Sequence, residues 1–273
     1  MSAGSSRLLR SELTLVLGRR RNQVGMLVLA AVPIVLAISI KVAASAPGPE
    51  APNFLGSVTQ NGLFVPLAAL GMELPFFLPL AIGLVAGDSV AGEANIGTLR
   101  YLLTVPVSRT RLLVLKFTMI VIAAAVAALL IVVVGAAIGI PLFGTGRMTL
   151  LSGTQIGMGD AVLRILIVTA YVVLCLASLG AIGLFLSTLT EQPIGAAIGV
   201  IAIDVISLIL DQIPQLDWLG PYLPTHHWTA FIEVFRDPIN WDPLVDGVFV
   251  ALTYIVVAWL AAWARFSSKD VTS

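Results

Sequence analysis

Charged residues are scarce in this chain. Asp, Glu, Lys and Arg make up 11% of its 273 residues, whereas an ordinary soluble domain carries roughly 25%. The sequence contains one cysteine, Cys175, which excludes a disulfide within the chain. It contains no Gly-Lys pair, and therefore no phosphate-binding loop of the Gly-Lys-Ser/Thr type. These absences argue against a soluble domain, a disulfide-stabilised fold and a chain that hydrolyses ATP by itself.

Long apolar runs take the place of charge. Apolar residues make up 58% of the sequence, and the mean hydropathy is +1.02. A helix needs about 20 apolar residues to cross a bilayer, and each run is too long for a barrel strand. The runs of this length are 24–44, 62–87, 113–140, 161–187, 194–213 and 244–264. We therefore predict an all-α integral membrane protein with six transmembrane helices.

The first run resembles a signal peptide, because three arginines precede it and Ala44-Ser45-Ala46 ends it. It is longer than the apolar core of a usual signal peptide, however, and five more runs follow it. We expect it to be retained as the first transmembrane helix.

The positive charges indicate an orientation. When the six runs are threaded in order, eleven of the fifteen Lys and Arg residues fall on the side of the N-terminus. The positive-inside rule then predicts that both termini are cytoplasmic. Before the first run, Leu9, Leu13, Val16 and Leu17 recur at helical spacing. This stripe predicts a cytoplasmic amphipathic helix on the inner leaflet, rather than a merely solvated basic tail.

The stretch between the second and third runs, 88–112, is the longest loop on the predicted inner side. Ile96, Leu99 and Leu103 recur at helical spacing there, and Pro106 ends the pattern. The pattern predicts one short amphipathic helix. Arg109 follows in the first turn of the next run, where the helix dipole favours acids instead. Anionic lipid or an acidic protein surface would explain this charge.

The order of residues in this loop resembles the loop after the second span in permeases of type-2 ATP-binding-cassette exporters. The residues that carry the resemblance are Glu93, Gly97-Thr98-Leu99, Leu102-Leu103, Pro106, Ser108-Arg109, Leu112 and Lys116. Six spans, a basic leader and the chain length are also similar to that family. The resemblance implies that the short helix is a coupling helix that docks into a separate ATPase subunit. The contact residues would be Glu93, Gly97, Thr98, Leu99, Arg100, Leu102, Leu103, Pro106 and Arg109.

The same resemblance implies the surroundings of the chain. The partners would be the ATPase subunit, a second permease copy or a homologous permease, and the lipid bilayer, with no nucleic acid. ATP and Mg would be bound by the partner ATPase, and this chain would bind no cofactor. It would be a transport subunit, not an enzyme, in a prokaryotic cell membrane. The whole chain, 1–273, would form one permease domain, with a leader (1–23), a bundle (24–264) and a cytoplasmic tail (265–273).

Two acids, Glu73 and Asp204, lie near the middle of apolar runs. A charge at that depth costs roughly 2.5–3.5 kcal/mol, so such residues usually face a partner or a wet cavity. We assign both to the translocation path, although hydrogen bonding or protonation within the bundle would also account for them. The second run carries Pro66, Pro75 and Pro79 as well, which predicts a bent helix beside the first acid.

The longest predicted outer segment is 214–243. Thr225 is placed to cap a short helix there, with Trp228, Phe231, Val234 and Phe235 on one face, and the helix is expected at the outer interface. His226 and His227 are adjacent, and no third ligand follows at helical spacing, so we predict no metal site.

Two other functions compete with an exporter permease. A membrane-embedded enzyme would use His226, His227 and outer acids such as Asp217, but no HExxH or GxSxG motif supports it. An ion-coupled secondary transporter would use Glu73 and Asp204, and should show repeated halves with matching interrupted helices. No convincing repeat is visible in the sequence.

Overall fold

The computed structural model describes residues 18–45, 61–95 and 108–268. Its helices are α2 (Arg20–Ser45), α4 (Phe64–Glu73), α5 (Phe77–Asn95), α7 (Arg109–Phe143), α8 (Met158–Leu189), α9 (Pro193–Asp211), η1 (Pro214–Tyr222), η2 (His226–Phe235) and α10 (Asp242–Ser268). Six of them, α2, α5, α7, α8, α9 and α10, are long and apolar enough to cross a membrane. The predicted all-α membrane fold with six spans is confirmed. The leader helix and the short helix of the long loop lie outside the described residues.

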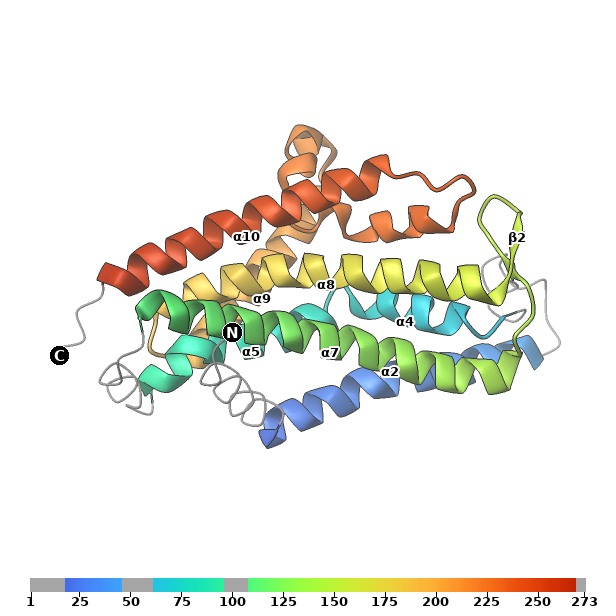
Figure 1. Cartoon of the computed structure of the whole chain (residues 1–273), viewed down its shortest axis with the longest axis horizontal. Helices are drawn as coiled ribbons and strands as arrows, with labels where there is room; N and C mark the ends of the chain where they lie inside the picture. The colour runs from blue at the N-terminus through green and yellow to red at the C-terminus, as the bar shows by residue number, and fades with distance from the viewer. Residues whose placement is uncertain (1–17, 46–60, 96–107, 269–273) are drawn as a thin grey trace.

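The helices lie side by side along the longest axis of the molecule, as Figure 1 shows. We call the end where α5 stops and α7 begins the loop end. The opposite end carries two short paired strands, β1 (Met148–Thr149) and β2 (Gln155–Ile156), and is called the hairpin end.

Helix α8 is the centre of the bundle. It packs against α5, α7, α9 and α10, and 72% of its most apolar window is buried, against 22% for α2 and for α10. Its segment 177–183 consists largely of alanine, serine and glycine. Small residues let helix backbones approach closely, which is how helices pack where lipid supplies no hydrophobic driving force. The outer helices instead expose large apolar residues such as Leu27 and Val257, as a lipid-facing surface should.

The second predicted span differs from expectation. We predicted one helix over 62–87, but the structure has two helices, α4 and α5, separated at residues 74–76, and α5 continues to Asn95. Pro75 lies in the interruption. Pro66 and Pro79 are each the third residue of their helix, where the backbone N–H has no partner within the helix in any case. The prediction that all three prolines bend a helix is therefore wrong for these two.

The long segment after α9 forms the short helices η1 and η2. Figure 1 shows η2 lying alongside α8 in the half of the bundle toward the hairpin end. Trp228, Phe231, Val234 and Phe235 are all buried, so the predicted apolar face is confirmed. Thr225 precedes η2 but makes no cap hydrogen bond; its hydroxyl instead lies 2.6 Å from that of Ser207 on α9. The segment therefore packs into the bundle and is tied to α9.

Candidate functional site

The last turns of α5 carry two carboxylates that pair with cations on neighbouring helices. Glu93 pairs with Lys116 of α7, and the two side chains are only 15% and 7% exposed. Asp88 pairs with Arg19 and with Arg21, the latter at 3.2 Å between Nη2 and Oδ2. A buried ion pair is weak evidence for stability, but losing one partner is costly because a charge is left in an apolar setting. The Glu93–Lys116 pair holds α5 against α7, whereas the Asp88 pairs, whose arginines are 44% and 42% exposed, link α5 to the start of α2 more weakly.

Ser187 of α8 joins the backbone of α5 directly. Its hydroxyl accepts hydrogen bonds from the N–H groups of Val90 (3.1 Å) and Ala91 (2.9 Å), and it donates to the carbonyl of Gly87 (2.7 Å). Gly87 and Ala91 are four residues apart, so the hydroxyl bonds to the two groups that a regular helix would bond to each other. The side chain thereby makes the last part of α5 and the end of α8 one hydrogen-bonded unit.

The contact between α5 and α9 is too close for side chains at two positions. A Cβ added at Gly87 would lie 2.8 Å from the Pro193 carbonyl oxygen and from the Ala197 backbone nitrogen. One added at Gly83 would lie 3.3 Å from Val200 Cγ1. The stretch 83–93 therefore touches four helices, α2, α7, α8 and α9, immediately before the loop.

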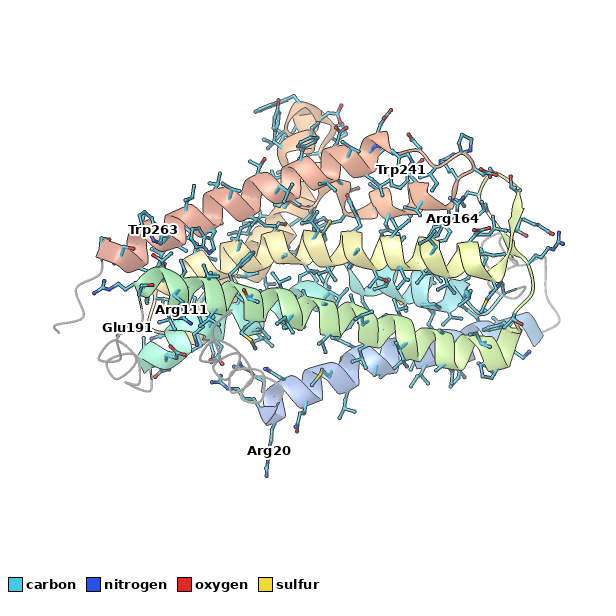
Figure 2. All side chains as sticks on the ribbon, viewed as in Figure 1. Arg20, Arg111, Arg164, Glu191, Trp241 and Trp263 are labelled. Atoms are coloured by element: carbon cyan, nitrogen blue, oxygen red, sulfur yellow. The ribbon has the colours of Figure 1, made fainter. Side chains whose placement is uncertain are left out.

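Arg109 connects the other side of the loop to α10. Its guanidinium donates to the carbonyls of Phe266 and Ser267, both at 3.0 Å. The Trp263 indole donates to the Thr110 hydroxyl at 3.0 Å. Figure 2 shows Arg111 and Trp263 near each other at this end, with Glu191 nearby. The basic first turn of α7 is thus explained in part by the carbonyls at the end of α10, which carry the negative end of a helix dipole.

The predicted loop 88–112 is shorter in the structure, because α5 continues through 88–95 and α7 begins at Arg109. Ser108 caps α7 by accepting from the Arg111 N–H at 3.3 Å, as its place in the sequence suggests. Glu93 lies on α5, not on a separate short helix. The remaining predicted ATPase contacts lie outside the described residues: Gly97, Thr98, Leu99, Arg100, Leu102, Leu103 and Pro106.

Glu73 and Asp204 are completely buried. In the part of the chain that the structure describes, neither carboxylate has a hydrogen-bond partner. Glu73 is the last residue of α4, where the second span is interrupted, and Asp204 lies in the middle of α9. Buried polar groups in native proteins are nearly always bonded, so two carboxylates without partners need an explanation.

The packing register brings the two acids to neighbouring levels. Because Gly83 contacts Val200 and Gly87 contacts Ala197, α5 and α9 run antiparallel, and each step back along α5 advances one step along α9. Continued by one turn, this register places Asp204 opposite the first residues of α5, just after Glu73. The register thus places Asp204 of α9 near the start of α5, whereas Glu73 ends α4 before the interruption.

An apolar pocket of about 570 Å³ lies between α4, η2 and the strands at the hairpin end. Phe64, Leu67 and Gly71 form the α4 wall, and Phe231 and Phe235 form the η2 wall. Gly71 is two residues from Glu73, and a Cβ there would lie 3.5 Å from the Phe231 ring. The pocket lies on the face of α4 that carries Phe64, Leu67 and Gly71, whereas Glu73, two residues after Gly71, points to the other side of the helix.

A family model described as "ABC-2 family transporter protein" matches residues 17–203, about two thirds of the chain. The chain belongs to the ABC-2 transporter family. It is a multi-pass membrane protein and a permease subunit of an ABC transporter. The matched residues include the whole cluster at the end of α5, together with Lys116 and Ser187, whereas Asp204, η1 and η2 lie beyond them. A comparison with curated proteins found no match.

In this ABC-2 transporter, the two histidines hold the short helices in place. His226 Nδ1 lies 2.5 Å from Asp211 Oδ1 at the end of α9, and Tyr171 of α8 donates to the His227 carbonyl at 2.7 Å. Burial, and to a smaller extent the neighbouring His226, lower the pKa of the His227 imidazole. No group of three or more His, Cys, Asp or Glu side chains gathers among the described residues.

Sequence reasoning missed three residues with structural roles in this transporter. Arg164 of α8 donates to the carbonyls of Val234 and Arg236, which end η2, and Figure 2 places it beside that segment. Asp88 was detectable, because it is an acid at the level of the basic leader in a chain with few charges. Ser187 carried no signal, since a serine in an apolar run is ordinary until its partners are known.

Proposed function

We propose that this chain forms the translocation path of an ABC exporter and couples to a separate ATPase subunit through the loop at residues 96–107. The observation that carries the proposal is the set of contacts made by residues 83–93, which directly precede that loop. Family membership supports an ATP-binding partner, and the partner would bind ATP and Mg. Two permeases, identical or homologous, would assemble with two ATPase chains in a prokaryotic cell membrane, with the loop end and both termini cytoplasmic.

In this proposal a movement of the loop reaches the bundle through α5. The Glu93–Lys116 pair passes the movement to α7, Asp88 passes it to α2, and Ser187 passes it to α8. Since α5 also touches α9 backbone to backbone at Gly87, the helix that carries Asp204 moves with it. The helices at the loop end thus move together when the ATPase moves the loop.

The other half of the proposal is the path for cargo. Glu73 and Asp204 supply buried polar groups at mid-depth, and the pocket beside η2 supplies an apolar volume on another face of α4. Such a combination suits an amphipathic cargo whose polar part meets the acids and whose apolar part enters the pocket. Movement of α9 would change the relative positions of these groups, because Ser207 ties it to the start of η2.

The test is a double substitution in the loop, Leu99→Ser with Leu103→Ser. A few anchor residues dominate most interfaces, so the variant should insert normally yet lose its ATPase or its cargo-stimulated hydrolysis. Leu189→Ser is the matched control, since it changes an exposed leucine at the same end of the bundle but outside the loop. The complex is extracted in mild detergent, and the bound ATPase and the hydrolysis rate are measured. Wild-type values for the double variant would overturn the coupling assignment.

A further inference from the structure

A narrow cleft of about 60 Å³ opens between α2, α5 and α7 in the part of the bundle near the loop end. Arg21 lines it at the start of α2, and Gly25, Ala81 and Ala123 are among the small residues that form its walls. Leu29 and Ile82 are buried at its far end. The cleft therefore has a cationic group and the polar Asn22 at one end and mostly apolar walls along the rest.

Several residues along the cleft are small, and they leave part of it open. A Cβ added at Gly25 would meet no atom within 4 Å. The start of α2 diverges from α7 in Figure 1, and Figure 2 labels Arg20 there. At roughly 10–15 Å³ for each water-sized group, the volume of the cleft corresponds to about four or five such groups. That shape fits a stretch of hydrocarbon chain, whereas water would find few partners on apolar walls.

The mouth of the cleft is positively charged. Arg19 and Arg21 both pair with one acid, Asp88, so these three residues carry a net charge of +1. Arg21 has five N–H donors, and its ion pair with Asp88, at 3.2 Å between Nη2 and Oδ2, engages one nitrogen. Arginine binds phosphate with paired, charge-assisted hydrogen bonds. The mouth is thus suited to a phosphate group that bears a net negative charge.

We propose that this cleft binds an anionic phospholipid, with its phosphate on Arg21 and an acyl chain between α2, α5 and α7. Charge complementarity selects an anionic over a zwitterionic headgroup, and the apolar walls select a lipid over a free phosphate ion. The binding site itself does not depend on coupling to an ATPase. Only the assignment of the lipid to the inner leaflet rests on the orientation in the proposed function.

The test is native mass spectrometry of the purified full-length chain, released from detergent with phosphatidylglycerol or with phosphatidylcholine. The wild type should retain phosphatidylglycerol in preference to phosphatidylcholine. Arg21→Gln should reduce that retention about fivefold, the effect of about 1 kcal/mol for one cation near a membrane surface. Gly25→Leu should reduce it at least as much by filling the cleft, without removing a charge. Arg20→Gln is the matched control, because Arg20 extends away from the bundle in Figure 2, and it should retain most of the lipid.

Four results would overturn the proposal. Equal retention of the two lipids by the wild type would remove the headgroup preference. Equal losses in Arg21→Gln and Arg20→Gln would show only diffuse attraction to a basic segment. Full retention by Gly25→Leu, or displacement of the lipid by millimolar inorganic phosphate, would show that no acyl chain occupies the cleft. No ATPase is present in these measurements, so a negative result leaves the proposed coupling untouched.

Discussion

The two ends of α5 differ in how the charged groups beside them are bonded. At the loop end, α5 places Asp88 and Glu93 against cations from α2 and α7, and Ser187 bonds to its backbone. At the interruption, Glu73 is completely buried without a hydrogen-bond partner in the described part of the chain. The first arrangement holds helices together. The second leaves polar groups that something else must satisfy, which is what a site visited by cargo requires.

This difference indicates which part of the bundle we expect to move. Paired and hydrogen-bonded groups make the end of α5 a single unit with its neighbours, so a force applied there is passed on. The region around Glu73 has a broken helix, an apolar pocket and short helices of the 3₁₀ type. Such short, weakly bonded segments open more easily than long helices. The comparison makes four predictions, taken from the largest expected effect to the smallest.

Breaking the buried pair at the loop end should have the largest effect. Lys116→Met leaves Glu93 as a charge in an apolar setting and should destabilise the protein by about 3–5 kcal/mol. The double variant Lys116→Met with Glu93→Gln should recover most of that loss, because no unpaired charge remains. Thermal unfolding in detergent measures both. The control is Arg147→Gln, which removes an exposed cation near the hairpin end. An equal loss of stability in this control would contradict the prediction that the buried pair matters more.

Removing the hydroxyl of Ser187 should have an intermediate effect. Ser187→Ala removes the hydroxyl without adding bulk and leaves buried backbone groups of α5 without this partner, at a cost of about 1–3 kcal/mol. It should also weaken the coupling of ATP hydrolysis to transport, measured as cargo moved per ATP. Thr118→Val is the control, since that exposed hydroxyl bonds only within its own helix among the contacts described. A variant with unchanged coupling would show that α8 takes no part in transmission.

Neutralising the acid at the interruption should change function rather than stability. Glu73→Gln removes a potential charge without a partner, so the unfolding free energy should shift by less than about 1 kcal/mol. Assembly and partner ATPase activity should persist while the set of exported compounds changes. Transport assays with a panel of amphipathic cations and neutral compounds measure this. Unaltered export of every compound would make Glu73 a structural residue and weaken the contrast between the two regions.

Lowering the pH should slightly reduce the stability of the protein through His227 of η2. Because burial lowers the pKa of His227, the unfolded chain takes up this proton first as the pH falls below about 6.5. The contribution of His227 to stability is therefore complete above that pH, declines as the pH falls toward the folded-state pKa, and is constant below it. The nearby groups Asp211, Asp246 and His226 also influence the pKa of His227. Thermal unfolding at pH 7.5 and 5.5 should show a larger acid-induced loss for the wild type than for His227→Gln. Identical losses would contradict the prediction.

Much of the fold was predictable because a helix that crosses a bilayer must be both apolar and long enough. Apolar length identified the six spans, and the spacing of Trp228, Phe231, Val234 and Phe235 identified the buried face of η2. The burial of Glu73 and Asp204 followed from their place in apolar runs. The interruption of the second span was only partly predictable, because a proline in the first turn of a helix and one that breaks a helix look alike in sequence.

The contacts that build the loop end were mostly not predictable. The Ser187 hydroxyl meets α5 about 100 residues away in sequence, and its position depends on how closely glycines such as Gly87 let three helices pack. Glu93 was expected at the start of a docking helix, whereas its place on α5 depends on how far that helix continues. Helix ends are set by tertiary contacts as much as by local sequence.

Helix length adds a property that neither region shows by itself. At 1.5 Å per residue, the 35 residues of α7 extend about 52 Å and the 19 residues of α9 about 28 Å. A hydrocarbon layer is about 30 Å thick; the apolar run of α7, residues 113–140, is about 42 Å long, and a tilt of 40° leaves it spanning about 32 Å. A thinner bilayer therefore strains α7 while α9 still fits it. Hydrophobic mismatch acts unequally on helices of one bundle, and the acyl-chain length of the surrounding lipid becomes a variable that acts on the transporter itself.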